Sequence, residues 1–216
     1  MRALIGIALA LARALASRTA AAEPSNRDLV FAGLLMAPPT YLLNVTLHEG
    51  SHALMAEAMG GDVTGVRLFP PGVDPRSKKF RFGWVYASGL RTKPQKLAFY
   101  LAPKMTGGLL LGGFAALVLT DAWPENRYGQ LALTVVGTGL WVDFSKDLLL
   151  FSRHNDVVKA FHLWCMRGWK QVPARLVYAG LVAGSGYVVA RAYQKTFDTQ
   201  DGTPAPRMIP LLSSRF

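Results

Sequence analysis

The sequence is most informative at residues 47–61, which read LHEGSHALMAEAMGG. His48 and His52 are four residues apart, so on a helix both imidazoles lie on one face, with Glu49 beside them. In this HExxH pattern two neutral imidazole nitrogens bind zinc, and the glutamate takes a proton from the zinc-activated water. The motif therefore predicts a zinc site with His48 and His52 as metal ligands and Glu49 as the catalytic general base.

The motif belongs to a long apolar segment. An apolar run extends from Leu29 to Leu47 and continues as helix-compatible sequence to Met59. This length is enough to span a bilayer, and Pro38-Pro39 is expected to kink the helix or to separate a short entry segment, because proline removes a backbone donor. Ionisable residues at membrane depth are costly and mark function. The alternative, two histidines at a helix end facing lipid headgroups, leaves their spacing unexplained.

Three further apolar stretches follow, at about residues 97–119, 131–151 and 176–192. Residues 62–90 differ, because apolar and aromatic side chains alternate there with polar ones around proline and glycine turns, as in a β-hairpin. We therefore expect a mainly α membrane protein with about four transmembrane helices and a small β-hairpin or sheet between helices one and two.

The composition agrees with this class. Of the 216 residues, 51% are hydrophobic and 17% are charged, with a formal net charge of +11. Soluble domains carry about 25% charged residues, and a nucleic-acid-binding protein has no need of membrane-length apolar runs, so we expect no nucleic-acid partner. Cys165 is the one cysteine and excludes an internal disulfide.

Basic residues are concentrated in two connections, residues 62–96 and 152–175, whereas residues 121–130 carry Arg127 against two acidic residues. The positive-inside rule then predicts that both basic connections, and with them the active site, face the cytoplasm of a bacterial inner membrane. Anionic membrane lipids are the expected partner of these basic residues.

The two ends of the chain are expected to lie outside the catalytic unit. Residues 1–22 have a basic start, an apolar run and an alanine tripeptide, so they are interpreted as a signal peptide or as an uncleaved N-terminal helix. Residues 23–194 form the predicted membrane-embedded metalloprotease-like domain. Residues 195–216 are expected to be a C-terminal tail without regular structure.

A catalytic zinc ion needs a third protein ligand and an open position. The candidates lie in or just after the third span, which runs in the same direction as the first and so ends at the same depth; they are Asp143, Asp147, His154 and Asp156. His162 is expected at the membrane interface, and Glu57 is turned away from the histidines on their own helix.

Residues 47–61 resemble the first core helix of the site-2 protease family of intramembrane zinc metalloproteases. Residues 83–90 look like the strand segment of that family, and residues 101–105 fall where it has a Leu-Ala-Gly-Pro turn. Its third ligand is an aspartate in an Asp-Gly pair after an Asn-rich, Pro-containing stretch. The nearest match here is residues 148–156, without the proline and with Val157 in place of the glycine.

The resemblance implies a three-helix core, Zn²⁺, and hydrolysis of peptide bonds in membrane-protein or peptide substrates, with Asp156 as the third metal ligand. Asp147 is the alternative on grounds of depth, and Asp143 is a candidate for a supporting or substrate-facing group. Two other functions remain open. One is an inactive metalloprotease-like scaffold or regulator, and the other is a metal transporter.

Overall fold

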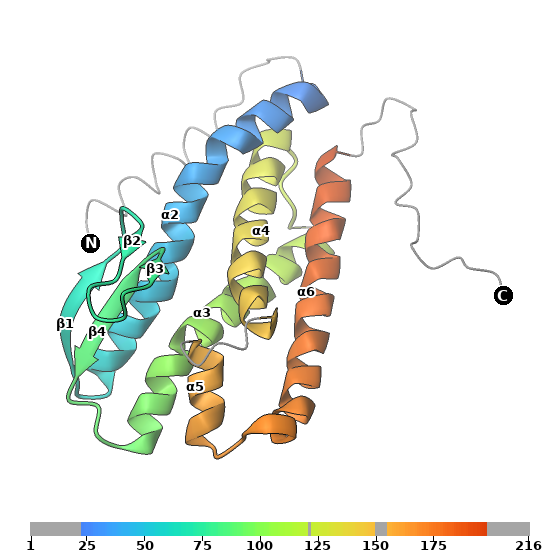
Figure 1. The fold of residues 1–216 in the computed structure, drawn as a ribbon. Coiled ribbons are helices and arrows are strands. Elements are labelled where there is room, and N and C mark those ends of the chain that lie inside the picture. Colours follow the sequence, from blue (N-terminus) through green and yellow to red (C-terminus); the bar gives the residue numbers. More distant parts are fainter. Residues whose placement is uncertain (1–22, 121, 150–154, 198–216) are drawn as a thin grey trace.

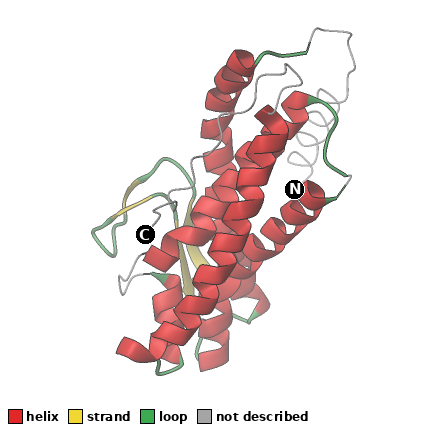
Figure 2. Cartoon of the chain, turned by 90° about the vertical axis from the view of Figure 1, so that its right-hand side faces the viewer, coloured by secondary structure: helices red, strands yellow, loops and turns green. Residues whose placement is uncertain are grey.

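A computed structural model describes residues 23–120, 122–149 and 155–197. The segment 1–22, interpreted above as a signal peptide or first helix, lies outside the described residues, as does the tail from residue 198. The described chain is mainly helical, with a small β arm at one side of the helices (Figure 1, Figure 2).

Helix α2 (Asn26–Ala58) carries the HExxH motif near its C-terminal end. It begins at a capping box, in which the side chains of Ser25 and Asp28 each accept a hydrogen bond from the backbone N–H of the other residue. It ends just before Gly60, whose φ of 75° turns the chain back at little steric cost. The motif thus lies on regular helix, as its four-residue spacing requires.

The helix continues through Pro38 and Pro39, so the two prolines do not separate an entry segment. Figure 1 shows the first turns of α2 inclined to the rest of the helix, which agrees with the predicted bend. Proline has this effect because it removes an intrahelical hydrogen bond and its ring clashes with the preceding turn.

The predicted β-hairpin is confirmed, and it forms an arm made of two antiparallel pairs of strands. Strand β1 (Asp62–Arg67) pairs antiparallel with β4 (Trp84–Ser88), and β2 (Gly72–Val73) pairs antiparallel with β3 (Phe80–Arg81). The arm lies beside the C-terminal half of α2 (Figure 1).

The remaining elements are α3 (Lys93–Leu119), α4 (Arg127–Leu149), α5 (Asp156–Leu163), the 3-10 helix η1 (Gly168–Gln171) and α6 (Val172–Phe197). Helix α5 lies in the connection that we expected to be a loop. It forms because the Asn155 side chain accepts hydrogen bonds from the first backbone N–H groups of the helix, while one face of α5 is buried. Residues 195–197, assigned above to the tail, are the last residues of α6.

Among the described residues, three segments are long and apolar enough to cross a membrane, namely Asn26–Ala58, Lys93–Leu119 and Gly168–Phe197. Many large apolar side chains on these helices are exposed, for example Leu35 at 79% and Leu109 at 77%. A lipid environment accounts for such surfaces. Helix α4, the predicted third span, is not in this set, because charged residues interrupt its apolar sequence.

Helix α4 packs against α2, α3 and α6. Glycines allow these close approaches: the ring of Phe114 on α3 covers Gly137, and the indole of Trp141 covers Gly186 on α6. Two buried apolar clusters join α3, α4 and α6, and the larger side chains in them include Phe114, Leu140 and Phe144. Since α4 faces protein on several sides, its polar side chains find partners there.

Candidate metal centre

The two motif histidines meet an aspartate from a distant part of the chain. One nitrogen of His48, one of His52 and one carboxylate oxygen of Asp156 all lie within 4.8 Å of one another. The Asp156 Oδ2 atom is 3.1 Å from Nε2 of His52 and 3.8 Å from Nε2 of His48. These three donor atoms, contributed by α2 and α5, could hold a metal ion.

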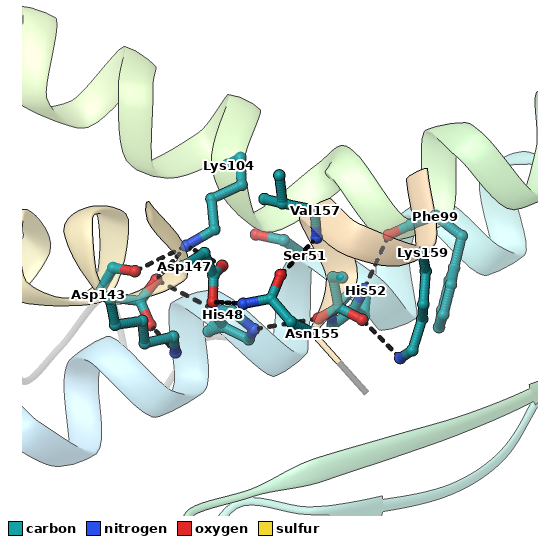
Figure 3. Close-up of polar contacts among 12 residues, drawn as sticks. His48, Ser51, His52, Phe99, Lys104, Asp143, Asp147, Asn155, Val157 and Lys159 are labelled. Atoms are coloured by element: carbon teal, nitrogen blue, oxygen red, sulfur yellow. Dashed lines mark hydrogen bonds and ion pairs between the residues drawn. The ribbon is translucent and has the colours of Figure 1, made fainter. Parts of the chain in front are cut away.

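The other ring nitrogen of each histidine is held by a hydrogen-bond acceptor. Nδ1 of His48 lies 2.9 Å from the Asp143 carboxylate, and Nδ1 of His52 lies 2.7 Å from the carbonyl oxygen of Phe99 (Figure 3). Because both partners accept, each Nδ1 carries the proton, and a neutral ring presents a lone pair at Nε2. Histidines that bind metals are oriented in this way.

This tautomer decides whether the residues fit a metal. With both rings neutral, the two Nε2 lone pairs and the Asp156 carboxylate face one another with no hydrogen between them. A metal ion placed among these three acceptors would satisfy all of them. Two imidazoles and one carboxylate with a remaining open position are the ligand set of catalytic zinc sites, so the residues fit zinc.

The two carboxylate oxygens of Asp156 have different partners. It is the first residue of α5, and its Oδ1 atom accepts a hydrogen bond of 2.7 Å from Nζ of Lys159, one turn further along. The Lys159 ammonium also lies over the ring of Tyr100. Lys159 therefore holds one carboxylate oxygen, and the other oxygen faces the histidines.

Asp147, the alternative third ligand, does not join the histidines. Its carboxylate accepts hydrogen bonds from Lys104 and Asn155, each at 2.6 Å. Asp143 instead supports His48, one of the two roles considered for it. Depth along the third span thus favoured a residue whose side chain is engaged elsewhere, whereas the family resemblance favoured the aspartate that lies at the histidines.

The other sequence candidates lie apart from the cluster. His154 is outside the described residues, Glu57 is exposed on α2, and His162 is near the end of α5 and belongs to no metal-binding group found in the described chain. The residue that sequence reasoning missed is Lys104. A lysine inside an apolar stretch of membrane length was the available signal, because such a charge requires a partner.

Glu49 faces a groove beside the histidines. The groove has a volume of about 490 Å³ and lies between the motif, the start of α5 and the strands β3 and β4. Within the described part of the chain, the Glu49 carboxylate makes no hydrogen bond, and so it remains available to a molecule in the groove. Gly83 allows the arm to come close, because a Cβ atom there would lie 2.9 Å from Cγ of Glu49.

Each of the three aspartates around the histidines has its own lysine. The pairs are Asp143 with Lys146, Asp147 with Lys104, and Asp156 with Lys159. The first pair lies within α4 and the last within α5, whereas the Asp147–Lys104 pair joins α4 to α3. Pairing reduces the cost of placing carboxylates in a poorly solvated region.

A scan against protein-family models, a search of curated proteins and a search of solved structures give no match to this chain. The function proposed below therefore rests on the residues of the site and their geometry.

Proposed function

We propose that this chain is an intramembrane zinc metalloprotease of the site-2 protease type, which hydrolyses peptide bonds of membrane-associated substrates. One observation carries the proposal: the donor atoms of His48, His52 and Asp156 converge, while Glu49 lines the same groove with a carboxylate that no described residue engages. A metal-binding scaffold would not need an unengaged carboxylate at this position.

Zinc bound by His48, His52 and Asp156 would supply Lewis acidity, which polarises a carbonyl group and makes water easier to deprotonate. Glu49 accepts the proton from water and later donates it to the leaving amine. Asp143 and the Phe99 carbonyl hold the imidazole rings in the orientation that this chemistry needs.

We further propose that α2, α3, α4 and α6 all cross the membrane, with α4 as the inner helix. The three apolar helices that surround it, and the partners of its charged residues, support this arrangement. The ends near the arm would face the cytoplasm of a bacterial inner membrane, where their basic residues meet anionic lipids. Residues 1–22 would be the targeting segment.

The substrate is proposed to bind in extended form along the arm. A helical substrate hides its carbonyl groups in intrahelical hydrogen bonds, so it must unwind before hydrolysis. Strand β4 lines the groove and has one strand neighbour among the described residues, β1, so one of its edges is available to an added strand. Val85→Pro removes a backbone donor from β4, and unchanged cleavage in this variant would contradict strand addition.

The proposal is tested by Glu49→Gln beside Glu57→Gln, the same substitution at an exposed position of the same helix. We expect detergent-purified wild type to hold about one zinc ion by elemental analysis and to cleave a membrane-embedded reporter. Glu49→Gln should keep the zinc and lose cleavage, and Glu57→Gln should keep both.

Three results would count against a protease. Wild-type protein without zinc, or with iron in its place, removes the basis of the mechanism. Bound zinc with equal, negligible cleavage by wild type and Glu49→Gln favours the scaffold. Zinc flux into proteoliposomes, abolished by His48→Ala, favours the transporter.

A further inference from the structure

A buried ion pair lies behind the metal centre. Lys104 on α3 is 9% exposed and Asp147 on α4 is 5% exposed, and their charged atoms are 2.6 Å apart. The Lys104 ammonium also donates to the backbone carbonyl of Asp143, at 2.7 Å (Figure 3). None of these contacts is required by the chemistry assigned above to Glu49 and the metal ligands.

The pair continues toward the third ligand through one side chain. Asn155 donates from Nδ2 to the Asp147 carboxylate at 2.6 Å, and its Oδ1 atom accepts from the backbone N–H groups of Val157 and Val158. Both ends of the amide are therefore used, so its orientation is fixed. The residue between the cap and these amides is Asp156.

Helix α3 contributes no metal ligand, yet it contacts both halves of the centre. Its Phe99 carbonyl orients His52, and its Lys104 begins a hydrogen-bonded chain that runs through Asp147 to Asn155, the cap of α5. The Ser51 hydroxyl, next to His52 in the motif, also shares a hydrogen bond of 2.9 Å with the Thr106 hydroxyl of α3. The relative placement of α2 and α5 thus depends on polar contacts made by α3.

Stability alone is a poor explanation for the ion pair. A buried lysine–aspartate pair often stabilises a fold no more than two apolar side chains of similar size would, and one attested role of such pairs is to enforce a specific arrangement. Here the arrangement concerns the start of α5, because Asn155 is the group that the Asp147 carboxylate holds in addition to Lys104.

We propose that Lys104, Asp147 and Asn155 are positioning residues for the third metal ligand. The Lys104–Asp147 pair holds Asn155, and Asn155 caps α5 so that Asp156 points one oxygen at the two imidazoles. This inference rests on the proposed zinc site and assigns the residues that determine its affinity.

The test compares zinc affinity, measured by competition with a chromogenic chelator, in wild type, Lys104→Met and Asn155→Ser. Serine keeps a capping oxygen for α5 but loses the donor to Asp147. Both variants should bind zinc about 10- to 100-fold more weakly, as is usual when the partners of metal ligands are removed. Lys104→Met also leaves Asp147 without its lysine.

Thr134→Val is the matched control for a loss of stability. Thr134 and Thr196 are both buried and their hydroxyls are 2.9 Å apart, joining α4 to α6 away from the metal centre. This variant should unfold at a lower temperature than wild type and bind zinc with wild-type affinity. A weaker affinity in Asn155→Ser at an unfolding temperature no lower than that of the control therefore identifies positioning.

Wild-type zinc affinity in Asn155→Ser and in folded Lys104→Met would overturn the inference and leave the protease proposal intact. Should Lys104→Met fail to fold, Asn155→Ser decides alone, because it retains the Lys104–Asp147 pair. A wild-type protein that binds no zinc would overturn the zinc site and this inference together.

Discussion

Nδ1 of His48 lies 2.9 Å from Oδ2 of Asp143, a residue 95 positions further along the chain. The contact joins α2 to α4 and fixes which nitrogen of His48 carries the proton. It leaves Nε2 directed at Asp156. The direction of one imidazole on the motif helix is thus set by a carboxylate on the inner helix.

Removal of the Asp143 carboxylate should weaken metal binding. We expect Asp143→Ala to lower zinc affinity about 10- to 100-fold, because the His48 ring loses its fixed orientation. Asp143→Asn should lose less, since its amide oxygen still accepts from Nδ1. Chelator competition measures both variants, and Val142→Ala, at an exposed neighbouring position, serves as the control. Equal affinity in Asp143→Ala and wild type would contradict this role.

A methyl group at Gly83 should push the arm away from the motif helix. The added Cβ would lie 2.8 Å from Cγ1 of Val45 and 3.0 Å from the backbone oxygen of Arg67, as well as close to Glu49. Overpacking of this kind costs about 1–3 kcal/mol. Gly83→Ala should therefore lower the unfolding temperature and reduce cleavage.

Gly112→Ala is the control for this substitution, because nothing lies within 4 Å of a Cβ atom there. In the middle of α3 it should be neutral or stabilising by up to about 1 kcal/mol. Similar unfolding temperatures for the two alanine variants would show that the arm is not closely packed at Gly83.

The arm should lose stability in acid through Asp74. This carboxylate is 3% exposed and accepts hydrogen bonds from the Ser77 and Tyr86 hydroxyls and from the backbone N–H of Arg76. Burial alone would raise the pKa of Asp74, but these hydrogen bonds outweigh it and hold the pKa well below its usual 3.8. An aspartate with a lowered pKa stabilises the folded state above its unfolded pKa and loses this effect as the pH falls toward its folded value.

Limited proteolysis of the arm at several pH values measures this effect. Asp74→Asn should be cleaved faster than wild type from pH 5 to 8. The difference should shrink below about pH 4, because the carboxylate of the unfolded arm takes up protons there while that of the folded arm stays ionised. A difference that stayed constant to pH 2 would exclude Asp74 as its source.

The proposed orientation predicts which side of the membrane exposes Cys165. This residue is the single cysteine in the sequence and is exposed after α5, at the end of the bundle near the metal centre. A membrane-impermeant maleimide should label it in inverted vesicles and not in intact spheroplasts. Ala122→Cys in a Cys165→Ser background, at an exposed position between α3 and α4, should give the opposite result. Labelling of Cys165 only in spheroplasts, and of the Ala122→Cys variant only in inverted vesicles, would show that the topology is the reverse of the proposed one.

The parts of the fold that sequence predicted are those with a local signal. The apolar run before His48, the alternation around Trp84 and the apolar stretch up to Leu119 are local patterns, and the structure places helix, strand and helix there. Helix α5 has no such signal, because eight residues are too few to form a helix alone and depend on the Asn155 cap and on burial.

In the candidate site, too, the residues that could be predicted are those with a local signal. His48, Glu49 and His52 share one helical turn, so their spacing was sufficient. The choice between Asp147 and Asp156 depended on the direction of side chains from two different helices, which depth along a span does not specify. The Lys104 ammonium pairs with the Asp147 carboxylate and so keeps Asp147 away from the histidines. Lys104 and Asp147 are 43 positions apart, which no local sequence pattern can connect.

The three aspartate–lysine pairs have a consequence for the order of assembly. Their acidic groups are compensated by the polypeptide itself, so the helices do not depend on a metal to neutralise them. Small zinc domains differ, since they remain unfolded until the ion arrives. With the zinc site proposed here, the bundle would fold first and receive its metal afterwards, so a chelator should empty the centre while leaving the helices assembled.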